Sequence, residues 1–369
     1  AAPARVMICD DSATIRGAIS RMLESDPGIQ VVSKASNGRM AIEELKRTKV
    51  DVLVLDIEMP VLDGMTALPL LLQTDPGLKI VMASTLTTRG ADIAMRALRM
   101  GAADYVPKPS TIGATSDERF KLELISKVKG LARLRNRAAL PPRPAPSCMT
   151  RPAPVLPPKL LAIGSSTGGP QALFTLIQAL GRSVNVPIVL TQHMPATFTP
   201  ILAEHITRLG GLPCAEAKDG EALLPGQIYL APGDKHLIVE RDGASAGRSP
   251  ASQPNGQRAP MGAVVARARL STDPPENFCR PAVDPMLRSA AGACDGRVLV
   301  TMLTGMGHDG LAGTRRVVEA GGAAIAQDEA TSVVWGMPGA IAQAGLCHAV
   351  LPLPRIAQKL LEMLRVPAK

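Results

Sequence analysis

Hydrophobic and polar positions alternate along the N-terminal part of the chain in a repeating pattern. Short apolar runs, RVMIC, VDVLVL and LKIVMAS, are separated by longer amphipathic stretches. In one such stretch, the spacing of Ile15, Ile19, Met22 and Leu23 places all four on one face of a helix. Buried strands that alternate with amphipathic helices are typical of a parallel sheet covered by helices. The pattern therefore predicts an α/β domain.

A second series of the same kind follows further along the chain. Its apolar runs are KLLAIGSS, PIVLTQH, QIYLAP, RVLVTMLTG and AAIAQD, and the first of them leads through the turn TGGP into the helical stretch QALFTLIQAL. We predict a second α/β domain with a mainly parallel sheet. A length of 369 residues also favours two domains over one.

Proline-rich sequence separates the two series. The segment NRAALPPRPAPSCMTRPAPVLPPK cannot form a helix or a central strand, because each proline lacks a backbone donor and has a fixed φ. We therefore predict a first domain at residues 1–134, an extended linker at 135–158 and a second domain at 159–369. Residues 242–260 interrupt the second series with small, polar and turn-forming residues, which indicates a flexible surface excursion.

Cysteine spacing and hydropathy bear on the location of the protein. The six cysteines include no C-x-x-C pair and no zinc-ligand spacing, which suits a reducing compartment. The apolar runs are too short to span a bilayer, and the first of them breaks at two aspartates instead of forming a signal peptide. We expect a cytoplasmic protein without membrane insertion.

The net charge of +9 raises the question of nucleic-acid binding. Aromatic residues make up only 2% of the chain and no helix carries a dense basic stripe, so we expect no nucleic-acid partner. Much of the excess charge lies between Lys127 and Arg151, around the proline-rich segment. We interpret it as part of a solvated linker, with contact to an acidic partner as the alternative.

Charged and hydroxyl side chains in the first domain follow the ends of predicted strands. Asp10 and Asp11 end the first strand, Asp56 and Ser84 end two others, and Lys108 follows the short run DYVP. Functional residues of open parallel sheets lie beyond the carboxyl ends of the strands, so these side chains should converge. Neighbouring carboxylates suit Mg²⁺, and the lysine would supply a positive charge for a phosphoryl group. For the two adjacent aspartates, capping of the following helix is an equal alternative.

Four motifs in the first domain resemble the response-regulator receiver family over residues of about 4–134. They are D-D at the first strand end, D-I-E-M-P-x-x-D-G, the serine after L-K-I-V-M-A, and Y-V-P-K-P. The resemblance implies a flavodoxin-like, doubly wound parallel sheet and a histidine kinase as phosphodonor. It implies these roles: phosphoacceptor Asp56, Mg²⁺ ligands Asp10, Asp11 and Asp56, phosphate contacts Ser84 and Lys108, and a switch aromatic Tyr105.

Three polar residues in the second domain lie at one predicted sheet edge. A serine doublet ends the strand KLLAIGSS, His193 ends PIVLTQH, and Asp309 lies in the loop after RVLVTMLTG. A serine hydroxyl becomes nucleophilic when a histidine takes its proton and a carboxylate orients that histidine. The serine turn alone is ambiguous, because glycine-rich turns between a strand and a helix more often bind phosphate or form a tight corner.

The chain contains five histidines, which need separate interpretations. His193 is the candidate base because of its place at a strand end. We expect His205 on a surface helix, His348 near a late strand and His236 in a turn. His308 adjoins the candidate aspartate, but in an extended loop it would point to the opposite side.

The second domain also resembles the chemotaxis protein-glutamate methylesterase (CheB) family over residues of about 159–365. The motifs are G-S-S-T-G-G-P, T-Q-H-M-P, A-P-G-D-K-H, R-P-x-V-D, L-T-G-M-G-x-D-G and G-M-P. The resemblance implies a Rossmann-like sheet with Ser166 as nucleophile, His193 as base and Asp309 as its partner. Ser165 stands where the family commonly has alanine, and His308 where it often has asparagine. The resemblance further implies support for an oxyanion from Thr167 and the backbone of Met306.

These resemblances imply a serine hydrolase, activated by phosphorylation and free of a catalytic-domain cofactor. It would remove methyl groups from glutamyl esters of methyl-accepting chemotaxis receptors, release methanol and deamidate selected glutamines. The same chemistry in a chemotaxis-like pathway without a role in motility is the alternative. A receiver joined to a DNA-binding domain is a different possibility, but it would require a helix-turn-helix where this chain has repeated apolar strands.

Overall fold

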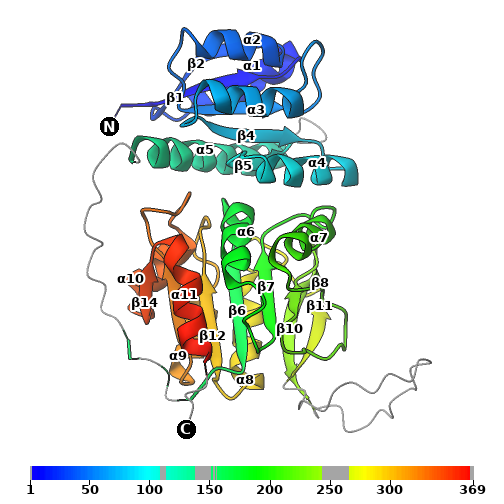
Figure 1. Ribbon diagram of the computed structural model, residues 1–369, viewed down its shortest axis with the longest axis vertical. Coiled ribbons are helices and arrows are strands. Elements are labelled where there is room, and N and C mark those ends of the chain that lie inside the picture. The colour runs from blue at the N-terminus through cyan, green and yellow to red at the C-terminus, as the bar shows by residue number, and fades with distance from the viewer. Residues whose placement is uncertain are drawn as a thin grey trace, which may run out of the picture.

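A computed structural model describes residues 2–108, 114–137, 151–152, 154, 156–242 and 266–365 of the chain. It contains two α/β units, one above the other in Figure 1. Most of the predicted linker, residues 138–150, and almost all of the predicted excursion at 242–260 lie outside the described residues. Within the described part of the chain, no helix has both the length and the apolar character of a membrane span.

The first unit is a five-stranded parallel sheet with strand order β2-β1-β3-β4-β5, which confirms the doubly wound fold expected from the sequence. Its strands are β1 (Ala4–Cys9), β2 (Ile29–Ala35), β3 (Val52–Asp56), β4 (Lys79–Ser84) and β5 (Asp104–Pro107). Its helices are α1 (Ala13–Glu24), α2 (Gly38–Leu45), α3 (Gly64–Thr74), α4 (Thr88–Arg99) and α5 (Ala114–Arg137). Every residue of β3 is buried, as expected for a central strand covered on both faces.

Helix α5 continues through Arg137, three residues into the segment assigned to the linker. The basic residues near its end were predicted to be solvated, and for Lys127 this is wrong. Lys127 is 3% exposed, and its Nζ lies 2.9 Å from Glu123 Oε1 and 3.5 Å from Asp104 Oδ2. The helix holds it there because neighbouring apolar side chains pack into the core of the first unit: Leu124, Val128 and Leu131.

The second unit contains a seven-stranded parallel sheet with strand order β14-β13-β12-β6-β7-β9-β8. This confirms the α/β domain with a mainly parallel sheet that the sequence predicted. The strands are β6 (Leu160–Ser165), β7 (Ile188–Gln192), β8 (Cys214–Glu216), β9 (Ile228–Leu230), β12 (Val298–Met302), β13 (Ala323–Gln327) and β14 (Ala349–Leu351). A separate antiparallel pair joins β10 (His236–Arg241) and β11 (Ala266–Ser271). The helices are α6 (Gly169–Leu180), α7 (Thr199–Gly210), α8 (Val283–Ala293), α9 (Leu311–Glu319), α10 (Met337–Gln343) and α11 (Leu353–Leu364).

The turn from β6 into α6 depends on glycine. Gly168 has φ of +75°, and a Cβ atom at this position would lie 2.5 Å from Val333 Cγ2. Both the left-handed backbone and the close approach exclude a larger residue. Pro170 then occupies the first turn of α6, where its missing donor leaves no intrahelical bond unmade.

The edge of the second sheet that holds this turn faces the first unit (Figure 1). The Gly168 N–H donates to Asp104 Oδ2 at 3.0 Å. On α6, Gln171 Nε2 lies 2.6 Å from both Leu98 O and Ala102 O of the first unit. Tyr105 of the first unit also stacks on Phe198 of the second, with 4.9 Å between the two ring centroids.

The interface also corrects the expectation for His205. We predicted a surface helix, but this side chain on α7 is fully buried, with Nε2 3.3 Å from Asp92 Oδ1 on α4. The first unit covers this part of α7 (Figure 1). The amphipathic pattern of one helix does not show which distant segment will cover its polar face.

Candidate active site and acidic pocket

The three predicted carboxylates of the first unit converge. Asp10, Asp11 and Asp56 each offer an oxygen, and these atoms all lie within 4.8 Å of one another. Lys108 Nζ is 2.7 Å from Asp10 Oδ2 and 2.7 Å from Asp56 Oδ1. Ser12 is the side-chain cap of α1, so helix capping does not account for this arrangement.

The electrostatics of this pocket leave negative charge uncompensated. Burial raises the pKa of Asp56, although its hydrogen bond with Lys108 acts in the opposite direction. Burial lowers the pKa of Lys108, but hydrogen bonds with Asp10 and Asp56 outweigh this effect and raise it. The Lys108 ammonium and the Arg16 guanidinium, which donates to the Asp10 and Asp11 carbonyls, do not balance three carboxylates. Oxygen ligands in this number suit a hard divalent cation such as Mg²⁺.

The side chains of the other two residues predicted to act in the first unit bond to or stack on groups other than the carboxylates. Ser84 is 1% exposed, and its hydroxyl donates to Gly90 O at 2.8 Å, toward the start of α4. Tyr105 is 5% exposed and stacks on Phe198 of the second unit. In this arrangement the Ser84 hydroxyl bonds to α4, and Tyr105 contacts the second unit.

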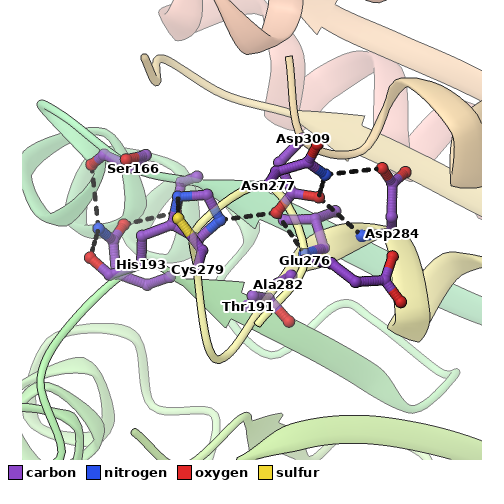
Figure 2. Close-up of polar contacts among 12 residues, drawn as sticks. Ser166, Thr191, His193, Glu276, Asn277, Cys279, Ala282, Asp284 and Asp309 are labelled. Atoms are coloured by element: carbon purple, nitrogen blue, oxygen red, sulfur yellow. Dashed lines mark hydrogen bonds and ion pairs between the residues drawn. The ribbon is translucent and has the colours of Figure 1, made fainter. Parts of the chain in front are cut away.

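The serine doublet in the second unit is distinguished by strand register. Ser165 pairs with Gln192 across β6 and β7, and Ser165 Oγ bonds to Gln192 Oε1 at 2.7 Å within the buried core. Side chains alternate between the two faces of a strand. Ser166 and His193 are the residues that directly follow these two paired strands, so they lie at the same edge of the sheet, and both are labelled in Figure 2. No hydrogen bond joins their side chains in the described structure. Gln192 Nε2 also joins the two segments, with distances of 3.0 Å to Ser166 O and 3.1 Å to His193 O.

His193 pairs with Asp309, as expected from the two strand ends. His193 Nε2 lies 2.7 Å from Asp309 Oδ2, and the aspartate is 2% exposed. The carboxylate also accepts from the backbone N–H groups of Val283 (2.6 Å) and Asp284 (3.1 Å) in the first turn of α8. Burial raises the pKa of Asp309, but the hydrogen bonds from the histidine and the amides outweigh it, and the net shift is downward.

The second ring nitrogen of His193 faces a residue that the sequence analysis did not consider for this site. Cys279 Sγ lies 3.4 Å from His193 Nδ1. Burial lowers the pKa of His193, but the hydrogen bonds with Asp309 and Cys279 outweigh it and raise the pKa to about 9. Nε2 is engaged by Asp309, so proton exchange with a hydroxyl would have to use Nδ1 in place of its contact with Cys279.

The candidate oxyanion residues lie on two loops near the same edge. Thr167 is 5% exposed, and its carbonyl accepts from Thr304 Oγ1 at 2.8 Å. Met306 is 37% exposed, in the loop between β12 and α9. His308 in that loop is exposed, and its orientation away from the site stays a prediction.

Two other histidines have structural partners. His236 is 2% exposed, and its Nδ1 accepts from Ala282 N–H at 3.1 Å while Nε2 lies 3.2 Å from Pro274 O. His348, just before β14, has Nδ1 2.8 Å from Arg151 O. The His236 and His348 rings are therefore bound to backbone groups and not to His193 or Asp309.

The comparisons with known proteins identify the family of this chain. The family model described as CheB methylesterase matches residues 161–360. The chain belongs to the CheB methylesterase family. The response regulator receiver domain model matches residues 6–116.

Relatives within the CheB family are similar over almost their whole length. The protein-glutamate methylesterase/protein-glutamine glutaminase 1 of Paramagnetospirillum magneticum is 52% identical, over 97% of this chain and 96% of the relative. The protein of the same name "of group 2 operon" from Rhodospirillum centenum is 55% identical, over 96% and 92%. The crystal structure of the Thermotoga maritima CheB methylesterase catalytic domain is 38% identical and covers 56% of this chain and all of that chain, with a TM-score of 0.48.

Proposed function

We propose that this CheB-family chain is a protein-glutamate methylesterase and protein-glutamine glutaminase controlled by its receiver unit. The observation that carries the proposal is the His193–Asp309 pair, 2.7 Å between the two atoms, at the same sheet edge as Ser166. The substrates would be methyl-accepting chemotaxis receptors.

In the proposed reaction, Ser166 Oγ attacks the carbonyl carbon of a glutamyl methyl ester while His193 Nδ1 takes the hydroxyl proton. The histidine returns that proton to the departing methoxide, which leaves as methanol. Water then attacks the acyl-enzyme with the same histidine as base, and the free glutamate is released. With a glutamine side chain, the leaving group is ammonia. Asp309 stabilises the imidazolium at each step.

Thr167 and the backbone of Met306 are the proposed support for the oxyanion. The helix N-terminus favours negative charge, and Thr167 lies directly after the nucleophile. The bond between Ser165 and Gln192 favours Ser166 as the attacking group, because the Ser165 hydroxyl is buried and engaged.

For the receiver unit, we propose that Asp56 accepts a phosphoryl group from a histidine kinase. Asp10, Asp11 and Asp56 would hold Mg²⁺, which would neutralise charge on the incoming group. Lys108 would contact the phosphoryl oxygens, and Ser84 would move toward them from its bond with Gly90.

The receiver contacts the loop of the proposed nucleophile directly. The Gly168 N–H donates to Asp104, and Phe198 stacks on Tyr105. These contacts join β5 of the receiver to the sheet edge that carries Ser166. We propose that the structure represents the less active arrangement and that phosphorylation shifts the population toward an open one.

The domain limits, partners and location are part of the same proposal. The sequence divided the chain into a receiver at 1–134, a linker at 135–158 and a hydrolase at 159–369; we propose the same division with the first boundary moved to Arg137, where α5 ends. A histidine kinase and receptor signalling domains as partners would place the protein in the cytoplasm. The name "of group 2 operon" in one relative is compatible with a chemotaxis-like pathway as the alternative setting.

The direct test compares Ser166→Ala with Ser165→Ala in methanol release from a methylated receptor. Ser166→Ala should lose about 10⁴- to 10⁶-fold in rate, as triad enzymes do without their nucleophile. Ser165→Ala should retain most of the activity. An inactive Ser165→Ala beside an active Ser166→Ala would overturn the assignment.

A further inference from the structure

A four-residue turn before α8 contacts both members of the proposed acid–base pair. The Glu276 N–H donates to Cys279 O at 3.1 Å, and the Cys279 N–H donates to Glu276 O at 2.8 Å. The two central residues have a left-handed backbone conformation, with φ of +51° at Asn277 and +62° at Phe278. This is the geometry of a type I′ hairpin turn, which favours asparagine at its first central position. We call residues 276–279 the Asn277 turn.

Asn277 reaches inward from this turn, while Phe278 at its tip is 90% exposed. The Asn277 Nδ2 atom lies 3.0 Å from Asp309 Oδ1 and 3.1 Å from Asp284 Oδ2 (Figure 2). An amide nitrogen carries two hydrogens, so one can be donated to each carboxylate. Both aspartates are buried, at 2% and 5% exposure, and Asn277 is a neutral donor between them.

Two carboxylates this close together repel each other. Burial raises the pKa of Asp284, and the charge of Asp309 adds to that effect even though Gly313 N–H donates to Asp284 at 2.6 Å. The donor shared by both groups stabilises the ionised form of each and fixes which oxygen of Asp309 faces His193.

We propose that Asn277 is a positioning residue of the reaction: its side-chain amide holds Asp309 against His193. This inference rests on the proposed roles of His193 and Asp309. Asn277 acts through Asp309, as a second layer of hydrogen bonding behind the pair.

The rest of the turn is held to the same helix. Arg288 on α8 forms a bidentate ion pair with Glu276, with N···O distances of 2.9 and 2.5 Å. Cys279, at the other end, contacts His193 Nδ1. Two ionisable side chains therefore contact the His193 ring, namely Asp309 and Cys279. Asp284 lies behind Asp309, and the Glu276–Arg288 ion pair lies on the far side of the Asn277 turn.

Loss of the amide should change the chemistry of His193 as well as the rate. A less well held Asp309 would stabilise the imidazolium less, so the pKa of His193 would fall. Because the histidine must be neutral to act as base, the acid limb of the pH–rate profile would move to lower pH. The rate constant kcat should fall about 10- to 100-fold, the range for a lost hydrogen bond to a charged group.

Asn277→Gly is the sharpest test, because glycine accepts the left-handed backbone and only the amide is removed. The matched control is Phe278→Gly, the same change at the next position, whose side chain contacts neither member of the pair. We expect a lower kcat and a shifted acid limb for Asn277→Gly and neither change for Phe278→Gly. Asn277→Asp should be slower than Asn277→Gly, since it adds a third carboxylate.

The readouts separate the possible outcomes. The positioning role is overturned if folded Asn277→Gly has the wild-type kcat and the wild-type acid limb of the pH–rate profile. It is also overturned if Asn277→Gly and Phe278→Gly change kcat and the acid limb by the same amount. If Asn277→Gly does not fold, Asn277→Asp is judged by the same two readouts. Asp309→Asn is included as well, because full activity there would refute the proposed catalytic pair itself and not only the role of Asn277.

Discussion

Removing one side chain at the boundary between the two units should raise the basal activity of the unphosphorylated enzyme. Gln171 lies on α6, and its Nε2 is 2.6 Å from both Leu98 O and Ala102 O of the receiver. The Gln171 side chain bonds to the receiver and makes no hydrogen bond with Ser166, His193, Asp309 or the acidic pocket. Gln171→Ala therefore weakens the contact between the two units and removes no side chain of either proposed site.

The size of the effect follows from the two hydrogen bonds. Each contributes about 0.5–1.5 kcal/mol net, so their loss should shift the closed–open equilibrium by about 1–3 kcal/mol. This corresponds to about a 5- to 150-fold change in the ratio of open to closed molecules. The basal rate should rise by that factor until it approaches the phosphorylated rate, and the fold stimulation by phosphorylation should shrink accordingly.

The assay is methanol release from methylated receptor, with and without a phosphodonor and Mg²⁺. Gln178→Ala is the matched control, since it is the same substitution at an exposed position on the same helix. A basal rate of Gln171→Ala equal to that of the wild type and of Gln178→Ala would refute inhibition through this contact. Phosphorylation would then have to act by stimulation or by recruitment to receptors.

Three further predictions concern single residues. His308→Asn should retain most activity while His193→Asn should lose it, measured by methanol release; equal loss would assign the base to the loop. Because the pKa of His193 is about 9 and the neutral ring is the base, kcat/KM should rise with pH toward that value. Asp309→Asn should move this rising part of the pH–rate profile to lower pH. A profile that does not move would argue against the His193–Asp309 pair. Asp56→Asn should stay at the basal rate with phosphodonor and Mg²⁺, and stimulation of this variant would exclude Asp56 as the acceptor.

Much of the fold and of the candidate site could be predicted because both depend on short, local patterns. Apolar runs marked the central strands, and the parallel arrangement put their carboxyl ends at one edge. That single rule brought His193 and Asp309 together from positions far apart in the sequence. It did not separate Ser166 from Ser165: that choice came from the family resemblance, and the register that pairs Ser165 with Gln192 was seen only in the structure.

Features that depend on distant contacts were not predicted. Asn277 and Cys279 come from a turn that follows no central strand, so no rule about strand ends points to them. His205 and Lys127 are polar residues on amphipathic helices, and each is buried by a segment remote in sequence. The signal that could have found the turn is the run E-N-F-C directly before R-P-A-V-D, which combines a carboxylate, an amide and a thiol.

The most direct test of the account is mass spectrometry of a methylated chemoreceptor before and after incubation with the enzyme. We predict that wild-type protein converts glutamyl methyl esters to free glutamate, faster with a phosphodonor and Mg²⁺, and that Ser166→Ala leaves the esters intact. Esters that persist with the folded, phosphorylated wild type, or that disappear equally fast with Ser166→Ala, would contradict the claim that this chain is a methylesterase acting through Ser166.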